Sequence, residues 1–301
     1  MELRHLRYFV AVAQHLSFTA AAESLGVAQP PLSQQIRDLE AEIGTELFVR
    51  TTRRVSLTPA GQDFRIEALA ILEKAGEAMD RARAIGAGTA GIINVGLTGS
   101  MLAGPLGESI RVFAERYPGV DLRIHEMSPD RQIMALKTGQ TDVSFLRSPP
   151  SDADLVSELA WKETVSLVLP RGHRLAAEKI ALADLDTENF VFLRLHDSLF
   201  AKYLWTCCVE AGFTPRISHQ VVEAASLTSL VAVGLGIAII PEFVARLAHR
   251  DVVYRPIEGR PIRADVHALW TKARAPLIEN FIDLVRLSSV RFAEDIQAGG
   301  R

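Results

Sequence analysis

The stretch VAQPPLSQQIRDLE, residues 27–40, places two consecutive prolines where an amphipathic helix begins. Its apolar residues recur at helical spacing and predict a buried stripe of Leu32, Ile36 and Leu39. Pro30 and Pro31 fall in the first turn, where backbone N–H groups have no intrahelical partner, so they stiffen the start of the helix at little cost. The opposite face of the same helix is polar.

The segments on either side of this helix predict the remainder of a small domain. Apolar residues from Leu3 to Ala13 recur at helical spacing, and Ser17 is a suitable N-cap for a two-turn helix that ends at Gly26. After Gly44, a short strand around Phe48, a basic turn and the strand VSL predict a β-hairpin. A hairpin wing that follows a helix-turn-helix is typical of a DNA-binding domain.

The DNA-binding prediction depends on where the charged residues lie and not on the net charge of the chain. The net charge is only −3, and residues 1–58 balance six arginines against six acids. Without the wing, a helical bundle with a solvated outer face would fit equally well. Glutamine can bond adenine, and arginines suit phosphates or the minor groove. The predicted DNA-binding residues are Gln29, Pro30, Pro31, Ser33, Gln34 and Arg37 on the helix and Arg50, Arg53 and Arg54 on the wing.

The sequence LRYFVAVAQHLSFTAAAESLGVAQPPLSQQIRDLEAEIGTELFVRTTRRVSLTPAG, residues 6–61, strongly resembles the LysR-type transcriptional regulators. The resemblance implies an α/β protein overall, with an N-terminal winged helix-turn-helix, a long linker helix and a C-terminal two-lobed, periplasmic-binding-protein-like effector domain. It also implies that the positions of the predicted helix residues, with the wing arginines, approach DNA. Ala28 departs from the serine N-cap that the family commonly has, a loss that typically costs about 1 kcal/mol.

From Pro59 onward, a heptad-like apolar stripe predicts one long helix. The stripe consists of Phe64, Ala68, Ile71, Ala75, Ala78 and Ala82. It fits either a helix docked on its own domain or a helix that pairs with a second copy, and the resemblance implies an antiparallel pair joining two subunits. The glycine-rich stretch IGAGTAG, residues 85–91, marks the end of the helix and a domain boundary.

Beyond this boundary, strands and helices alternate as βαβαβ, which predicts a mostly parallel sheet. A second unit of strands and helices follows, and VHALWT with the helix 276–292 returns to the first, giving two lobes joined by two crossover strands. The expected domains are 1–58 for DNA binding, 59–88 for the linker and dimerisation helix, and 89–301 for effector binding, with lobe I at 91–161 and 267–301 and lobe II at 162–266.

Two α/β lobes place a ligand in the cleft between them, near strand C-termini and helix N-termini. Ser100 follows a strand and could hold an anion with neighbouring N–H groups, and the Arg147 guanidinium could clamp a carboxylate. Ser100 and Ser128 also fit plain helix caps, and Arg147 a surface ion pair. The predicted effector-binding residues are Thr98, Gly99, Ser100, Ser128, Phe145, Arg147, His196, Ser198, Leu199 and Phe200.

The resemblance implies a small effector in this cleft, and the DVSFLR–PP stretch resembles the branch that answers to muconates and other aromatic-breakdown acids. We therefore expect a cytoplasmic, sequence-specific transcription factor controlled by a carboxylated metabolite. Its expected partners are double-stranded promoter DNA, the effector, RNA polymerase and further copies of the chain, as a homodimer or a homotetramer.

Other classes of function find little support in the sequence. An enzyme would need paired acid–base groups, yet nothing pairs with Glu223 or His196, and no GxSxG, P-loop or nucleotide fingerprint is present. A transport-type binding protein would need an export signal, which the N-terminus does not resemble.

Metal, redox and membrane roles are also not expected. The sequence has no HExxH or CxxC spacing, so we expect neither a metal site nor a cofactor. A disulfide between the adjacent Cys207 and Cys208 would be strained, which favours inert thiols over an oxidant sensor. No apolar run approaches the roughly 20 residues of a membrane span.

Overall fold

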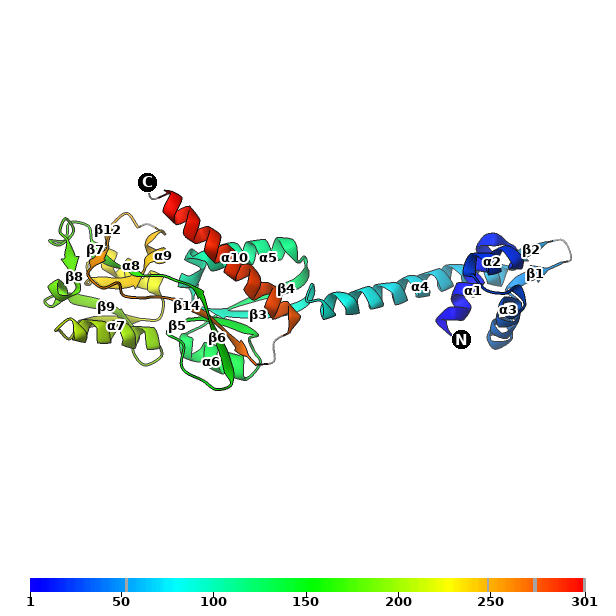
Figure 1. Ribbon diagram of the computed structural model, residues 1–301, viewed down its shortest axis with the longest axis horizontal. Helices are drawn as coiled ribbons and strands as arrows, with labels where there is room; N and C mark the ends of the chain where they lie inside the picture. Colours follow the sequence, from blue (N-terminus) through cyan, green and yellow to red (C-terminus); the bar gives the residue numbers. More distant parts are fainter. Residues whose placement is uncertain (52–53, 248, 273–274, 300–301) are drawn as a thin grey trace. The chain divides into compact units, whose positions relative to one another are not determined.

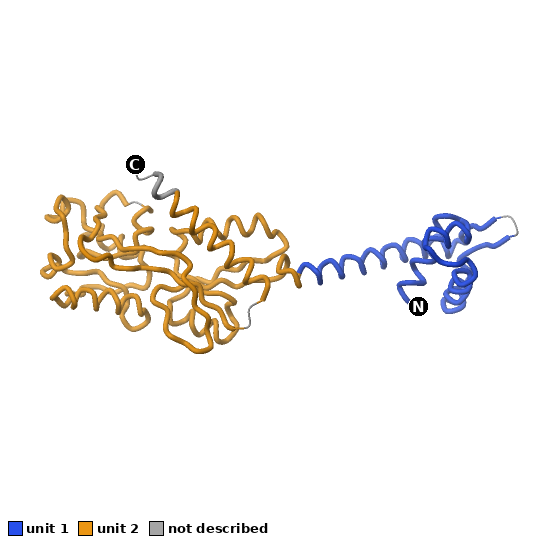
Figure 2. Tube along the Cα trace, in the orientation of Figure 1, with its two compact units in different colours: residues 1–84 blue, residues 85–301 orange. Residues whose placement is uncertain are grey.

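The first unit of the structure, Met1–Ala84, is a winged helix-turn-helix followed by a long helix (Figure 1; Figure 2). The computed structural model describes residues 1–51, 54–247, 249–272 and 275–299. The elements of this unit are α1 (Leu3–His15), α2 (Phe18–Leu25), α3 (Gln29–Ile43), β1 (Phe48–Arg50), β2 (Val55–Leu57) and α4 (Pro59–Gly86).

Local sequence signals set the ends of α2 and α3, as predicted. The Ser17 hydroxyl accepts a hydrogen bond from the Ala20 N–H at 3.3 Å, and Gly26 ends α2 in the left-handed conformation, with φ 65°. Ala28 is the N-cap of α3 without a side-chain cap bond, and the prolines lie in the first turn. The fixed φ of proline compensates in part for the missing cap.

The core of this unit is built from one face of each helix. Leu32, Ile36 and Leu39 are fully buried, which confirms the predicted stripe on α3. They pack with Phe9, and the Phe9 ring lies 5.2 Å from that of Phe48 at the start of the wing. The polar face of α3 is thereby turned away from the unit's interior.

Helix α4 divides into two parts. Phe64, Ala68 and Leu72 pack against the core of the first unit, so this part is docked on its own domain. Further along, large apolar side chains are exposed, with Met79 at 47% and Ile85 at 52%. The first part of the stripe is therefore docked on its own domain, and pairing of the remainder with a second copy stays a prediction.

The second unit, Ile85–Arg301, contains two lobes. Lobe I has a five-stranded sheet in the order β4-β3-β5-β14-β6, in which β3 is parallel to β4 and β5, whereas β14 is antiparallel to β5 and β6. Its elements are β3 (Ala90–Leu97), η1 (Gly99–Ala103), α5 (Pro105–Arg116), β4 (Gly119–Glu126), α6 (Pro129–Lys137), β5 (Val143–Arg147), β6 (Leu155–Trp161), β14 (Val266–Thr271) and α10 (Pro276–Gly299).

Helices cover both faces of the lobe I sheet. Helices α5 and α10 lie side by side on one face, where Phe113 and Phe281 meet Phe145 in a fully buried core, and α6 covers the other face (Figure 1). The sequence pattern predicts a helix from Leu102 to Tyr117 here, but α5 begins at Pro105, because Gly99–Ala103 form a separate 3-10 turn.

Lobe II has its own core, and its strands pair in both parallel and antiparallel directions. Strands β11 and β12 both pair antiparallel with β7, whereas β9 and β10 are parallel. Its elements are β7 (Val165–Pro170), β8 (Ile180–Ala181), η2 (Leu182–Leu185), β9 (Asn189–Leu193), α7 (Leu199–Glu210), β10 (Arg216–Val221), α8 (Ala224–Ala232), β11 (Ala238–Pro241), α9 (Glu242–Ala245), β12 (Val252–Arg255) and β13 (Ile257–Glu258).

Two short segments join the lobes, as the sequence predicts. Residues 162–164 leave lobe I and residues 263–265 return to it, and the two run antiparallel through a bridge between Thr164 and Arg263. The Ala264 N–H donates to the Glu163 carbonyl at 2.7 Å. The two chain connections between the lobes therefore lie side by side and are bonded to each other.

Among the described parts of the chain, we find no helix with the length and hydropathy needed to cross a lipid bilayer.

Gly61 yields a prediction for the stability of the first unit. An added Cβ at Gly61 would lie 2.0 Å from the Leu47 carbonyl oxygen, a backbone atom that cannot move aside. We expect Gly61→Ala to destabilise this unit by about 2 kcal/mol through overpacking. The measurement is urea unfolding followed by circular dichroism.

Gly76 on the same helix is the matched control, because nothing lies within 4 Å of its added Cβ. Gly76→Ala should stabilise the helix by about 0.5–1 kcal/mol. All three tryptophans, Trp161, Trp205 and Trp270, belong to the second unit, so their fluorescence should not change in either variant. Equal unfolding curves for the two variants would contradict the packing argument.

Candidate functional site: a helix face for DNA and a cleft between lobes

The N-terminal part of α3 presents the first group of predicted site residues to solvent. Gln29, Pro30 and Pro31 are exposed in the first turn, Gln34 and Arg37 are exposed one and two turns on, and Ser33 is half-buried. The fold therefore brings all six residues together on one accessible surface. The packing of the opposite stripe in the core holds this surface rigidly.

Gln34 and Arg37 are bonded to each other along the helix. The Gln34 carbonyl accepts from Arg37 Nη2 at 2.7 Å, and its amide donates to an Asp38 oxygen at 2.7 Å. Both ends of the Gln34 amide thus have partners within the chain. In the described part of the chain, the second N–H of the Gln34 amide is still free to donate, whereas its oxygen already accepts from two nitrogens of Arg37. No such bond holds Gln29 within the described residues.

The wing arginines are in different situations. Arg50 forms an ion pair with Glu40 and lies over the Phe18 ring at 5.0 Å, so it fastens the wing to the helices. Glu40 also accepts from the Leu47 and Phe48 N–H groups at 2.9 and 3.1 Å. Arg54 is exposed at the start of β2, and Arg53 lies outside the described residues.

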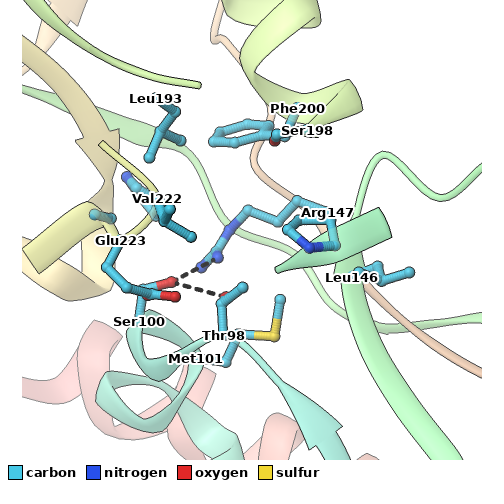
Figure 3. A pocket seen from close by; sticks show the side chains of 13 residues that line it. Thr98, Ser100, Met101, Leu146, Arg147, Leu193, Ser198, Phe200, Val222 and Glu223 are labelled. Atoms are coloured by element: carbon cyan, nitrogen blue, oxygen red, sulfur yellow. Dashed lines mark hydrogen bonds between the residues drawn. The ribbon is translucent and has the colours of Figure 1, made fainter. Parts of the chain in front are cut away.

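Arg147 lies at the centre of the second group, in the cleft between the lobes (Figure 3). It is 8% exposed, its Nη1 donates to Ser100 Oγ at 3.2 Å, and Ser100 Oγ lies 3.3 Å from Thr98 Oγ1. The guanidinium carbon lies 5.9 Å from the centre of the Phe200 ring. Arg147 Nε is buried and lacks a hydrogen-bond partner among the described atoms.

Glu163 balances the charge of Arg147. Its carboxylate accepts from Arg147 Nη2 at 2.8 Å and from the Phe243 N–H at 2.9 Å, and its side chain is fully buried. Its own N–H donates to Asp265 on the returning segment at 2.9 Å. Arg147 is therefore a buried ion-pair partner at the crossing of the lobes, not the surface partner that the sequence left open.

The cleft has a small inner cavity and a larger outer hollow. The inner cavity, lined from lobe I by Thr98, Ser100 and Arg147 and from lobe II by Phe200 and other residues, holds about 30 Å³, room for one or two waters. The outer hollow shares Arg147 with it and holds about 390 Å³, within the size range of small-molecule sites.

The remaining predicted residues divide between the two spaces. Ser198 borders both and caps α7 by accepting from the Ala201 N–H at 3.2 Å. Leu199 and His196 line the outer hollow and are exposed. Gly99 adjoins the inner cavity through its neighbour Ser100.

Two predicted residues, Phe145 and Ser128, line neither the inner cavity nor the outer hollow. Phe145 is fully buried in the core of lobe I, where it stacks on Trp161 with centroids 6.0 Å apart. Phe145 lies two residues before the end of β5, whereas Leu146 and Arg147 at that end line the cleft. Ser128 donates to Asp130 at 2.5 Å, which lowers the pKa of that carboxyl, and it borders a separate hollow beside α6.

The described residues contain no group of three or more His, Cys, Asp or Glu side chains that could hold a metal ion. Cys207 and Cys208 are free thiols. Burial raises the pKa of Cys208 to about 12 and that of Cys207 as well, which disfavours the reactive thiolate form.

Comparison with known proteins now identifies the two parts of the chain. Residues 3–62 match the family described as bacterial regulatory helix-turn-helix protein, lysR family, and residues 86–288 match the LysR substrate binding domain. The chain belongs to the LysR family of transcriptional regulators.

Relatives and solved structures agree with this assignment. The regulator AlsR of Bacillus subtilis is 34% identical over 98% of both chains, and the Hca operon transcriptional activator HcaR of Escherichia coli is 37% identical over 96% of this chain and 99% of HcaR. Full-length CbnR in complex with its target DNA is 31% identical, with a TM-score of 0.84 over 96% of this chain and all of that one. These relatives are transcriptional regulators, so this LysR-type protein is a DNA-binding regulator with an effector-binding domain and not an enzyme.

Two carboxylates of the cleft escaped the sequence analysis as site residues. Glu163 lies between Lys162 and Thr164 in the polar connection from β6 to β7, where the sequence does not distinguish it from a solvent-exposed acid. Glu223 follows β10 and precedes α8, the same strand-to-helix position that pointed to Ser100. Applying that rule to lobe II would have found it.

The buried pair in this LysR-type regulator yields a stability prediction. Arg147→Met leaves Glu163 charged and buried without its partner, so we expect a loss of about 3–5 kcal/mol. Adding Glu163→Gln removes the unpaired charge while an amide oxygen can still accept from Phe243, so the double variant should recover most of that loss. Tryptophan fluorescence during urea unfolding measures the second unit. Additive losses in the double variant would show that the two residues are not coupled.

Proposed function

We propose that this LysR-type regulator binds promoter DNA sequence-specifically by inserting the N-terminal part of α3 into the major groove. Gln29, Ser33 and Gln34 would contact base edges, and Pro30, Pro31 and Arg37 would border the backbone. The exposed polar face of α3, opposite a fully buried stripe, is the observation that supports this proposal most strongly. CbnR, solved with its target DNA, shares the fold along nearly the whole chain.

The wing adds contacts to the DNA backbone in this proposal. Arg54 is exposed and available for a phosphate, and Arg53 is proposed from the sequence alone. Arg50 contributes mainly by holding the wing in place, because Glu40 and Phe18 already engage its guanidinium. These roles divide the three arginines between binding and positioning.

The assembly that we propose is a homodimer formed through α4, with two dimers making a homotetramer. Ile71, Met79 and Ile85 expose apolar surface on a helix of 28 residues, and their burial against a second copy of α4 would stabilise that helix. The corresponding division of the chain is 1–58, 59–88 and 89–301. The structure's compact units divide instead at Ala84, inside α4.

The proposed effector is a carboxylated metabolite from aromatic breakdown. Arg147 supports a carboxylate, since its Nε donor is buried and unpartnered in the described structure. The outer hollow supports an apolar ring, because Ile133, Met134 and Leu199 line it. The effector would lie in the hollow with its carboxylate directed at Arg147.

Effector binding would change the angle between the lobes and thereby the packing of subunits on bent DNA. A useful switch needs the effector to favour one state by about 1–3 kcal/mol. We propose that the relaxed DNA helps to recruit RNA polymerase and that the protein acts as an activator in the cytoplasm. HcaR, a relative along nearly the whole chain, is described as an activator.

The two kinds of DNA contact predict different losses. Gln29→Ala and Ser33→Ala should lower discrimination between operator and random DNA by about 1–3 kcal/mol per base contact, whereas Arg54→Ala should weaken binding to all sequences and reduce the salt slope by about 1. Fluorescence anisotropy at several salt concentrations measures both. Arg123→Ala, which removes one exposed charge from β4 in the second unit, is the control. The groove assignment fails if the α3 and wing variants lose binding in the same way.

The switching mechanism predicts a change in the complex on DNA. With cis,cis-muconate or benzoate as the probe acid, the protected promoter region should shorten and the DNA bend should decrease. The reason is that the proposed change in subunit packing lets the tetramer hold the DNA in a less bent form. Footprinting and circular-permutation mobility shifts measure the two quantities. A footprint of unchanged length with an unchanged bend, under conditions where the acid binds, would contradict the mechanism.

A further inference from the structure

The inner cavity contains a carboxylate of the protein itself. Glu223 of lobe II lines the cavity together with Ser100 and Arg147 of lobe I, and Figure 3 shows its side chain extending beside Ser100. Burial and the Glu126 carboxylate raise the pKa of Glu223, and the Ser100 and Gly99 N–H groups and Arg147 oppose this rise. Glu223 is thus an acid from one lobe that meets polar groups of the other.

We propose that Glu223 is an internal competitor of the effector. In the effector-free protein, its carboxylate takes the place beside Ser100 that the effector's carboxylate takes later, and so it holds the lobes together. A carboxylated effector must displace it to bind. This inference rests on the proposed function for the class of effector, but not for the contact between the lobes.

The volume of the cavity supports displacement over simple addition. The inner cavity holds about 30 Å³, so it admits a water or two but no carboxylate with its carbon skeleton. Thr98, Ser100, Arg147 and Phe200 are all buried around it. Withdrawing the Glu223 side chain frees the space of one carboxylate beside the same donors.

The charge around the cavity supports the same conclusion. Arg147 is already neutralised by Glu163, and a further carboxylate, Glu126 at the end of β4, repels Glu223. Burial and this repulsion raise the pKa of Glu223, against the lowering effect of the donors. An effector carboxylate arriving while Glu223 stays in place would add another negative charge to this region. Withdrawing Glu223 from the cavity therefore removes one negative charge and also frees volume for the effector's carboxylate.

Glu223 also has an alternative place to go. It is the N-cap residue of α8, a helix of nine residues, and in this structure its side chain makes no cap bond. The positive end of a helix favours a nearby carboxylate. The displaced side chain can therefore turn from the donors of lobe I to the first turn of its own helix, which lowers the cost of displacement.

Amide hydrogen exchange tests the contact without any effector. The N–H groups of Gly99 and Ser100 open η1 and have no partner within it, so their protection depends on Glu223. In the full-length protein, Glu223→Ala should speed exchange in the segment 98–101 at least tenfold. Glu223→Gln, which keeps an acceptor oxygen, should retain part of the protection. Unchanged exchange in the folded Glu223→Ala protein would overturn the proposal.

Glu126→Gln is the matched charge control. It removes one carboxylate close to Gly99 but within lobe I, since an added Cβ at Gly99 would lie 2.6 Å from Glu126 Oε1. Exchange in the segment 98–101 should stay at the wild-type rate in this variant. Acceleration as large as in Glu223→Ala would mean that local charge, and not the bridge between lobes, protects these amides, and would overturn the proposal.

Calorimetric titration with benzoate and cis,cis-muconate tests the competition. Both Glu223 variants should bind a probe acid at least fivefold more tightly than wild type, and the bound acid should restore protection to the segment 98–101 in Glu223→Ala. Equal or weaker binding by the variants would overturn the competition. If no probe binds any form of the protein, the effector class of the proposed function is rejected, while the exchange measurement still decides whether Glu223 bridges the lobes.

Discussion

The buried pair of Arg147 and Glu163 constrains the whole sensing half of this regulator. Glu163 lies on the segment that leaves lobe I, accepts from the backbone of α9 through Phe243, and donates its own N–H to Asp265 on the returning segment. Since a buried charge without its partner is strongly unfavourable, these connections must persist together. They fix the guanidinium at the junction of the lobes, and the cleft is arranged around it.

The DNA-binding half depends on a different constraint, the rigidity of the start of α3. The prolines fix the backbone of the first turn, and Leu32, Ile36 and Leu39 anchor the same helix in the core. The exposed side chains further along α3 are not anchored in the core. Gln34 bonds both Arg37 and Asp38 instead. The exposed face of α3 therefore combines a stiff backbone with side chains that bond one another.

The sequence predicts the first unit well because its signals are local. Ser17 caps α2 by accepting from an N–H only three residues away, and Gly26 ends the same helix, so both signals are visible in a short window. The two lobes and their crossings also follow from the alternation of strands and helices. Phe145 was misplaced because only the last residues of β5 line the cleft, and the sequence does not show how far along a strand the cleft extends.

The sequence could not predict which strands pair when they lie far apart along the chain. The antiparallel partners of β7 are about 70–90 residues downstream, and the direction of a strand depends on its whole connection. Strand β6 and the short strands β8, β12 and β13 carry weak local patterns and were not predicted. Likewise, Glu223 meets Ser100 only because two lobes face each other, a relation that no local pattern contains.

The paired crossing of residues 162–164 and 263–265 has a consequence for how the protein can register chemistry. Because these two segments are bonded to each other, any change in the angle between the lobes passes through this one crossing. In the switching mechanism proposed above, the shape and polarity of whatever occupies the cleft would be reduced to that one angle. Proteins with the same two-lobed domain could therefore evolve pockets for new compounds while the movement at the crossing stays the same. The parts of the protein that respond to this movement would not have to change.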